Sequence, residues 1–329
     1  MEVMKSSFLE VPDFLALPIF GVSVSQSSVK IVKLKKKKQG LIPVVFDEVH
    51  FEEVCDFFTE TEKYSECTQL KKALTDLKKK HNMQFAQLSV PEESTYVFRI
   101  MVPQEALTMV DEFVANNIDQ YIPLTQPEVF FDYKILKSHI SESLVPVVVT
   151  AIPRLVIEKY TAMFRSCGIF VIGCEPETHA IARAVIDKGD INPYIIVYID
   201  EYATKISVVE EGLIQYTQTL AIKSSDISEH ISPEVASSLK DGINKVIIYW
   251  FTSKEKHTEA HKIENVILTG VGIDSPEFVN FFESNLSVNA MHANVWKNCF
   301  DITSYVPTMS KQDSLKYATC IGLSLFKLK

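Results

Sequence analysis

Apolar and polar positions along the chain form two blocks that open in the same way. In the first block, residues 20–25 and 28–34 are rich in β-branched side chains, a serine-rich turn joins them, and a third such run follows at residues 42–49. Runs of this kind separated by turn residues predict a β-meander. The second block repeats the pattern at residues 194–200, 204–209 and 213–222. The repeat lies in the pattern and not in residue identity, and it predicts two similar lobes.

Strands and helices alternate after each meander. Apolar residues at helical spacing predict helices over residues 70–77, 104–117, 154–167, 176–186 and 233–250. Short apolar runs predict strands at residues 85–90, 96–102, 129–136, 145–152, 169–173 and 265–269. The run at residues 145–152 is nearly free of charge, which is typical of a strand in the middle of a covered sheet. The alternation predicts an α/β fold.

The composition is that of a soluble globular protein with more than one core. The chain has 329 residues, of which 47% are hydrophobic and 23% charged, and this length exceeds one ordinary core. Its net charge of −9 would repel nucleic acid and anionic lipid, so neither is expected as a general partner. No apolar run reaches the roughly 20 residues that span a bilayer, and residues 1–10 lack a signal-peptide pattern. We therefore expect a cytosolic protein with no direct membrane insertion.

Three further features have ordinary explanations. Six cysteines with no C-x-x-C pair are typical of reduced, mostly buried thiols. The lysine-rich run at residues 33–38 is interpreted as a solvated hairpin turn, with contact to acidic lipid headgroups as the alternative. His257 and His261 stand one helical turn apart, but no third ligand for zinc is visible near them.

The first segment whose residues suit a binding site is the turn between the first two strands. A tight turn offers backbone N–H groups to a phosphate, and Ser25, Gln26, Ser27 and Ser28 add side-chain donors there. Lys30 follows on the outgoing strand and would add a positive charge. The alternative is a plain hairpin with a polar turn, because short motifs have a real false-positive rate.

Two later segments would complete a phosphate site. Asp200 stands at a predicted strand end, a position from which a carboxylate would hold Mg²⁺ or its water. Thr204 lies just beyond it. The alternative is that Asp200 only forms a turn, because acids at strand ends often do so. The motif Gly270-Val271-Gly272 follows an apolar strand, and glycine lets a backbone approach a ligand closely. Each segment alone is a weak signal, and their order along the chain adds to it.

Together these segments resemble the actin-like ATPase fold, which is ribonuclease H-like. The chain is most similar to the family of the type IV pilus assembly protein PilM, a relative of the cell-division protein FtsA. The most specific match is Tyr121-Ile122-Pro123, followed by Asp132-Tyr133. Further matching segments lie at residues 14–18, 27–30, 88–91, 98–103, 151–154, 175–177, 182–184 and 317–323.

The resemblance implies an architecture of duplicated lobes with insertions. Lobe 1 (subdomain 1A) would comprise residues 14–92 and 145–190, interrupted by an FtsA-like inserted subdomain (1C, an SHS2 domain) at residues 93–144. Lobe 2 (2A) would comprise residues 191–221 and 262–329, interrupted by a small subdomain (2B) at residues 222–261.

The resemblance also implies a role. It implies that ATP and Mg²⁺ lie between the lobes, with Asp200 as the metal-binding residue. It implies a cytoplasmic scaffold beneath the inner membrane, which captures the cytosolic N-terminal tail of a PilN-like membrane protein and joins other proteins of the pilus platform. For that tail we expect contacts with Phe98, Ile100, Phe130 and Tyr133 on strands of the inserted subdomain.

The sequence departs from the family at the nucleotide loops. The first loop of the family usually carries an acid where Ser23 stands, and a frequent glycine is replaced by Ser25. The second loop of the family reads Asp-Ile-Gly, and here it reads Asp200-Glu201-Tyr202. A tyrosine brings bulk to the phosphate position, and Glu201, if it points inward, would repel a phosphate. Because losing a positioned acid commonly costs about 10²–10⁴ in rate, we expect little or no hydrolysis and weak or lost ATP binding.

Two other functions stay open at this point. One is an ATP-binding actin-like ATPase whose nucleotide state gates assembly, or a sugar-kinase relative. A kinase would need a catalytic base near the first loop, and none stands out there. The other is an FtsA-like, membrane-associated filament protein, against which we note that residues 325–329 would make a very short anchor.

Overall fold

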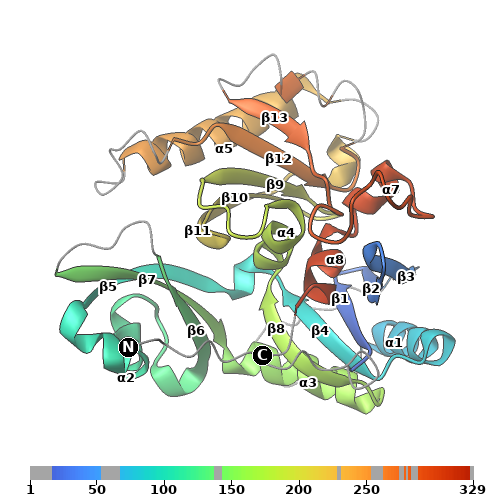
Figure 1. The fold of residues 1–329 in the computed structure, drawn as a ribbon, viewed down its shortest axis with the longest axis horizontal. Helices are drawn as coiled ribbons and strands as arrows, with labels where there is room; N and C mark the ends of the chain where they lie inside the picture. Colours follow the sequence, from blue (N-terminus) through green and yellow to red (C-terminus); the bar gives the residue numbers. More distant parts are fainter. Residues whose placement is uncertain are drawn as a thin grey trace.

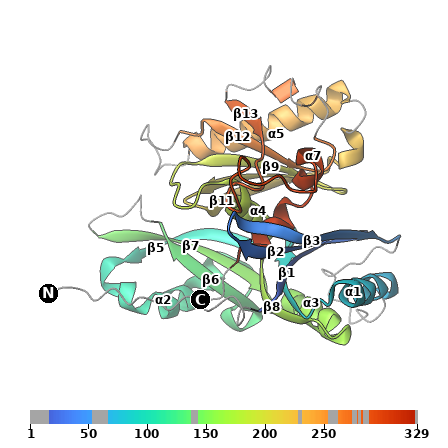
Figure 2. The same ribbon diagram turned by 45° about the vertical axis from the view of Figure 1, so that its right-hand side comes forward.

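The computed structural model describes residues 17–52, 67–136, 143–227, 231–252, 262–273, 278, 281–282 and 288–326. It contains two five-stranded sheets and one three-stranded sheet. Figure 1 shows the two larger sheets one above the other, with the helices labelled α4 and α8 between them and the smaller sheet at one side. Figure 2, turned by 45°, shows the same separation of the upper sheet from the two lower ones.

The first large sheet begins with the predicted meander and continues with two parallel strands. Its order is β3-β2-β1-β4-β8, in which the first three strands are antiparallel neighbours and β4 and β8 run parallel to β1. The strands span Ile19–Val24 (β1), Ser28–Lys37 (β2), Gly40–His50 (β3), Phe85–Val90 (β4) and Phe170–Pro176 (β8). Helices α1 (Thr68–His81) and α3 (Arg154–Ser166) pack apolar faces into the same core.

The second large sheet repeats the topology of the first. Its order is β11-β10-β9-β12-β13, again an antiparallel meander followed by two parallel strands. The strands span Tyr194–Ile199 (β9), Thr204–Glu210 (β10), Leu213–Leu220 (β11), Asn265–Gly270 (β12) and Asn289–His292 (β13). Helix α5 (Pro233–Thr252) packs Leu239, Ile243 and Trp250 into this core. The duplicated lobes predicted from the hydrophobic pattern are therefore confirmed.

The three-stranded sheet belongs to the inserted part of the chain and corrects one predicted boundary. Its order is β5-β7-β6, formed by Tyr96–Pro103 (β5), Leu144–Pro153 (β7) and Val129–Ile135 (β6). We assigned residues 145–153 to lobe 1, but β7 is the central strand of this sheet. The apolar run correctly indicated a covered central strand; periodicity alone does not say to which sheet a strand belongs.

The helix of the inserted part is also shorter than predicted. Residues 104–109 form a 3₁₀ helix, and α2 spans Val110–Asn117. Helix α2 buries Val110 and Val114 against β5 and β7 on one face of the sheet. The other face contacts the second lobe through a small cluster that includes Leu136, Val148 and Leu213. The inserted sheet is thus packed between its own helix and the second lobe.

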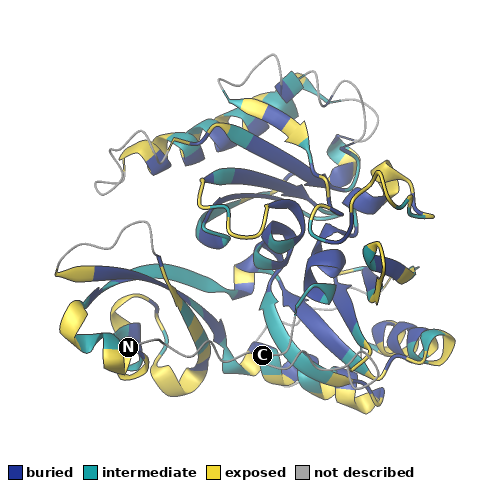
Figure 3. Ribbon diagram, viewed as in Figure 1, coloured by how far each residue is buried: buried dark blue, intermediate teal, exposed yellow. Residues whose placement is uncertain are grey.

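Helices α4 (Glu177–Val185) and α8 (Ala318–Ser324) lie between the two large sheets. They cross so closely that a Cβ on Gly322 would lie 1.7 Å from the carbonyl oxygen of Ala180. Nearly every residue of both helices is buried (Figure 3). This helix pair packs against strands of both large sheets and so fixes the lobes at their base.

Two minor expectations need correction. The lysine-rich run is not a turn, because residues 33–37 continue β2 and only residues 38–39 turn. Cys167, Cys174, Cys299 and Cys320 are free thiols, as expected, but Cys67 is disulfide-bonded.

His257 and His261 lie outside the described residues. In the part of the chain that is described, no helix has both the length and the apolarity needed to cross a bilayer.

Candidate functional site

The serine-rich turn of the first lobe surrounds a carboxylate from the second lobe. The hydroxyl of Ser27 donates to Oε2 of Glu201 at 2.9 Å, and the hydroxyl of Ser25 donates to the same oxygen at 3.3 Å. The hydroxyl of Ser28 lies 3.4 Å from Oε1. The backbone N–H of Ser28 donates to Oγ of Ser25 at 3.0 Å, which holds the hydroxyl groups on one side of the turn. Three serines of one lobe thus contact a single carboxylate of the other.

Lys30 brings a buried positive charge to the same carboxylate. It is 6% exposed, and its Nζ lies 3.3 Å from Oε1 of Glu201 and 3.2 Å from Oε1 of Glu48. Glu48 lies opposite Lys30 on β3 and pairs with Lys316 at 2.7 Å. Burial alone would lower the pKa of Lys30, but the carboxylates of Glu201 and Glu48 outweigh it and hold the pKa above its ordinary value. The amine therefore stays charged.

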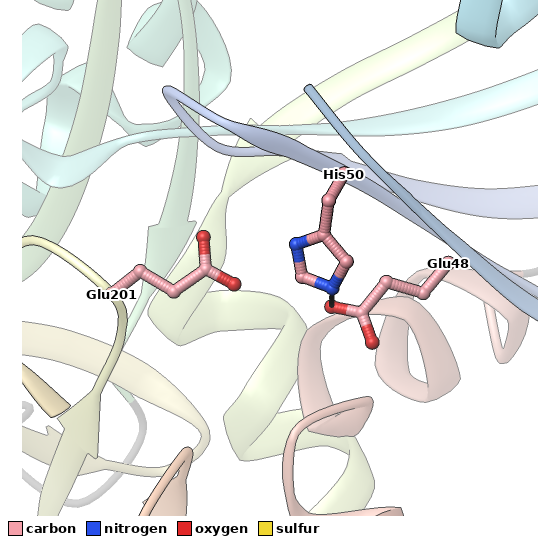
Figure 4. A group of neighbouring side chains, drawn as sticks. All are labelled: Glu48, His50 and Glu201. Atoms are coloured by element: carbon pink, nitrogen blue, oxygen red, sulfur yellow. Dashed lines mark ion pairs between the residues drawn. The ribbon is translucent and has the colours of Figure 1, made fainter. Parts of the chain in front are cut away.

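Glu48, His50 and Glu201 bring one potential metal-ligand atom each close together (Figure 4). One ligand atom from each lies within 4.8 Å of the others, and Nε2 of His50 lies 3.5 Å from Oε1 of Glu48. Both carboxylates, however, already pair with the ammonium of Lys30. A divalent cation would meet that positive charge, so we assign no metal to this group.

Asp200 follows β9, and its carboxylate is engaged on both sides by its own lobe. Oδ1 accepts the backbone N–H groups of Tyr202 at 2.6 Å and Ala203 at 3.0 Å, which is the hydrogen bonding of an Asx turn. Oδ2 lies 3.3 Å from Nζ of Lys205. Lys205, on β10, is 3% exposed, and it also forms a close ion pair with Glu177.

Lys205 is the charge at the centre of an acidic cluster. Burial alone would lower its pKa, but Glu177 and Asp200 outweigh burial and hold the pKa well above its ordinary value. Glu92 begins the short 3₁₀ helix that follows β4 (Glu92–Ser94), and it accepts the backbone N–H of Thr178 at 2.7 Å. Burial, with the charge of Glu177, raises the pKa of Glu92 to about 7. The ammonium of Lys205 is thus the positive charge that pairs with the carboxylates of Glu177 and Asp200.

This arrangement does not fit Mg²⁺ at Asp200. Both carboxylate oxygens of Asp200 are already hydrogen-bonded or ion-paired. Mg²⁺ takes oxygen ligands in an octahedral shell at about 2.0–2.1 Å, and the ammonium of Lys205 would stand beside it. The cationic partner of Asp200 is therefore the lysine of the neighbouring strand.

The third predicted segment has a structural explanation. Gly270 has φ +118°, and a Cβ there would lie 2.0 Å from the carbonyl oxygen of Ile199. That oxygen accepts the N–H of Val271 at 2.9 Å. Gly270 lets β12 approach β9 next to Asp200, and Gly272, with φ +77°, turns the chain away. Close packing alone accounts for the glycine at position 270.

The predicted nucleotide residues converge in part. Ser25, Ser27, Ser28 and Lys30 meet at Glu201, and Gly270 meets the strand that ends at Asp200. Two other members lie apart. The hydroxyl of Thr204 donates to the carbonyl of Ile222 at 2.8 Å, and Gln26 is exposed at the turn.

The four predicted partner-binding residues lie in different environments. Phe130 is 41% exposed on β6, and the guanidinium of Arg154 lies 4.0 Å from its ring centre. Phe98 stacks on Tyr121 with ring centres 4.8 Å apart. Tyr133 packs against the core of the inserted subdomain, and Ile100 is 3% exposed within it. Phe130 is therefore the member of this set that is open to a partner.

Four charged residues of the site were missed by sequence reasoning, namely Glu48, Glu92, Glu177 and Lys205. The sequence does contain a signal for Lys205, because it is the one charged residue in the predicted run 204–209. A lysine inside such a strand needs an anionic partner. The identity of that partner depends on the lobe packing, which no local pattern encodes.

Comparisons with known proteins agree on the fold. Residues 21–236 match the family described as type IV pilus assembly protein PilM. A solved structure described as a PilM-PilN type IV pilus biogenesis complex contains a chain that is 16% identical, with a TM-score of 0.73 over 94% of this chain and 98% of that chain. The ethanolamine utilization protein EutJ from Carboxydothermus hydrogenoformans is 14% identical, with a TM-score of 0.50 over 94% of this chain and 89% of that chain. No curated protein gave a significant match. The chain has the actin-like ATPase fold that the sequence predicted.

Proposed function

This chain belongs to the family of the type IV pilus assembly protein PilM, and we propose that it is a cytoplasmic scaffold of a type IV pilus platform. In this role it binds the cytosolic N-terminal tail of a PilN-like membrane protein, which holds it at the inner face of the membrane beside other platform proteins. The observation that carries the proposal is the family match over residues 21–236, together with a fold similarity to the PilM-PilN complex that covers 94% of this chain.

The surface that best suits the tail is the outer edge of the three-stranded sheet. Among the strands that the structure describes, β6 pairs with β7 alone and is an edge strand, and edge strands accept extended peptides by backbone hydrogen bonding. Phe130 projects from this strand beside Arg154. An aromatic ring and an arginine are the side chains that most often dominate binding energy at interfaces.

Fluorescence polarisation with a labelled PilN-like N-terminal peptide tests this function. We expect Phe130→Ala to weaken binding by at least about tenfold, because a central aromatic contact is worth more than about 1 kcal/mol. Phe170→Ala is the matched control, since Phe170 is 60% exposed on β8 of the first lobe and contacts Phe85. Equal affinity of wild type and Phe130→Ala would remove this edge from the interface. Failure of the wild-type protein to bind any such peptide would reject the scaffold function itself.

We further propose that nucleotide turnover has no part in this function. Support comes from Glu201, which occupies the serine-rich turn, and from Lys205, which pairs with Glu177 and Asp200. A phosphate-release assay with ATP and Mg²⁺ tests the proposal, and we expect no release above the buffer control. Sustained turnover by the purified wild-type protein, with the peptide or without it, would contradict it.

A further inference from the structure

Glu201 has the surroundings that proteins normally build around a phosphate group. Two serine hydroxyls donate to its Oε2, a third hydroxyl lies beside Oε1, and a buried ammonium lies 3.3 Å from Oε1. Hydroxyl donors and a lysine at hydrogen-bonding distance are the usual recognition groups for an anionic oxygen. The donors come from the first lobe and the anion comes from the second.

The local charge is balanced only when Glu201 is included. Lys30 and Lys316 contribute two positive charges, and Glu48 and Glu201 contribute two negative charges that pair with them. Without Glu201, the turn would face solvent with a net positive charge and three serine hydroxyls lacking this acceptor. Such a turn is an anion-binding site, and in this chain a side chain fills it.

The acidic cluster around Lys205 follows the same principle with the opposite sign of charge. Asp200 and Glu177 attract a cation, and Lys205 supplies it from the next strand, shielded from water. Glu201 and Lys205 stand within five residues of each other in the loop and strand that follow β9. One short segment of the second lobe thus provides both an anion for the first lobe and a cation for its own acids.

We propose that the serine-rich turn and Lys30 form an anion-binding site whose resident ligand is the carboxylate of Glu201, so that phosphate-type anions bind there only when this carboxylate is removed. This proposal rests on the proposed absence of nucleotide turnover, for which it gives a structural reason. It does not depend on which partner the scaffold binds. It joins the two lobes through the chain's own charges.

Isothermal titration calorimetry of the full chain with inorganic pyrophosphate tests the proposal. We expect Glu201→Ala to bind pyrophosphate at least about tenfold more tightly than wild type, because a close like charge is removed and the donors are released. Glu264→Gln is the matched control, since Glu264 is an exposed glutamate of the same lobe, and it should behave as wild type. Adding Ser27→Ala and Ser28→Ala to the Glu201→Ala protein should abolish the gain, which locates the site.

The remaining outcomes are decisive. Equal pyrophosphate affinity of wild type and a folded Glu201→Ala protein overturns the proposal, and so does a gain that survives removal of both serines. Glu201→Ser removes the charge and also empties the turn, so it provides the same comparison if the alanine variant does not fold. Peptide binding should be unchanged in Glu201→Ala, so a failed pyrophosphate test leaves the scaffold function to its own assay.

Discussion

Lys30 of the first lobe and Glu201 of the second lobe form a salt bridge of 3.3 Å, with side chains that are 7% and 21% exposed. We expect Lys30→Met to destabilise the protein by about 3–5 kcal/mol, because removing one member of a buried ion pair leaves the other charge without compensation. Glu48 loses the same partner. Urea unfolding at neutral pH measures the change.

A surface lysine provides the control for this prediction. Lys80 pairs with Asp47 at 2.7 Å, but its side chain is 65% exposed, so Lys80→Met should cost no more than about 1 kcal/mol. If Lys30→Met and Lys80→Met cost the same, the interlobe salt bridge does not contribute as we argue. In a double-mutant cycle, Glu201→Gln should cost less in the Lys30→Met background than in wild type.

Lys205 should be replaceable by a divalent cation. Lys205→Ala leaves the carboxylates of Glu177 and Asp200 without their shared ammonium, and we expect a loss of about 3–5 kcal/mol in the presence of a chelator. Added Mg²⁺ or Mn²⁺ should raise the thermal unfolding midpoint of this variant and leave that of wild type nearly unchanged, because carboxylate oxygens are the ligands these ions prefer.

The matched control for the cation prediction is Lys297→Ala. Lys297 pairs with Asp187 at the surface, so its removal should change neither stability nor the response to Mg²⁺. Equal responses of wild type and Lys205→Ala to the cation would show that the ammonium does not occupy a cation position.

The fold follows from local patterns in this chain to a large extent. The β-branched runs before and after the serine-rich turn predict β1 and β2, and the Glu211-Gly212 turn predicts the corresponding hairpin of the second lobe, where both residues have positive φ. What local patterns do not contain is the sheet to which a strand belongs. The strand predicted at residues 145–152 is a central strand, β7 at Leu144–Pro153, but its hydrogen bonds go to β5 and β6.

The sequence predicts those residues of the site that can be recognised within one local segment. The serine-rich turn, Asp200 and Gly270 can be recognised from strand ends and glycine spacing. We expected Glu201 to repel a phosphate if its side chain points inward. The side chain does point at the turn, where its carboxylate accepts a hydrogen bond from Ser27. The partners Glu48 and Glu177 are separated from Lys30 and Lys205 by 18 and 28 residues, so only the folded arrangement brings each pair together.

Glu92 and His179 should give the protein opposing pH dependences. Burial lowers the pKa of His179 to about 3, so between that pH and about 6.5 the unfolded chain binds a proton that the folded chain does not, and stability falls as the pH falls. The pKa of Glu92 is raised to about 7. Between about 4.5 and 7 the folded chain keeps a proton that the unfolded chain loses, so stability falls as the pH rises.

The variant Glu92→Gln separates these two contributions. It mimics the protonated carboxyl, and so its stability should fall more steeply than that of wild type on acidification from about pH 6.5 to 5, by at most about 1.4 kcal/mol per pH unit. His179→Gln should show the opposite change relative to wild type. Denaturant unfolding at several pH values measures both slopes, and parallel curves for the three proteins would contradict the assignment.

Gly322 in α8 should tolerate no side chain. A Cβ at this position would lie 1.7 Å from the carbonyl oxygen of Ala180, and a backbone oxygen in a packed helix cannot move aside. We expect Gly322→Ala to cost at least about 3 kcal/mol, at the upper end of overpacking effects, although alanine gains about 1 kcal/mol of helix propensity over glycine.

Gly242→Ala in α5 is the control, because the nearest atoms to its Cβ would be the methyl ends of Leu220 and Ile206, which can rotate. Thermal unfolding should place Gly242→Ala near wild type and Gly322→Ala far below it. Similar midpoints for the two variants would mean that α4 and α8 can separate at low cost and do not fix the lobes at their base.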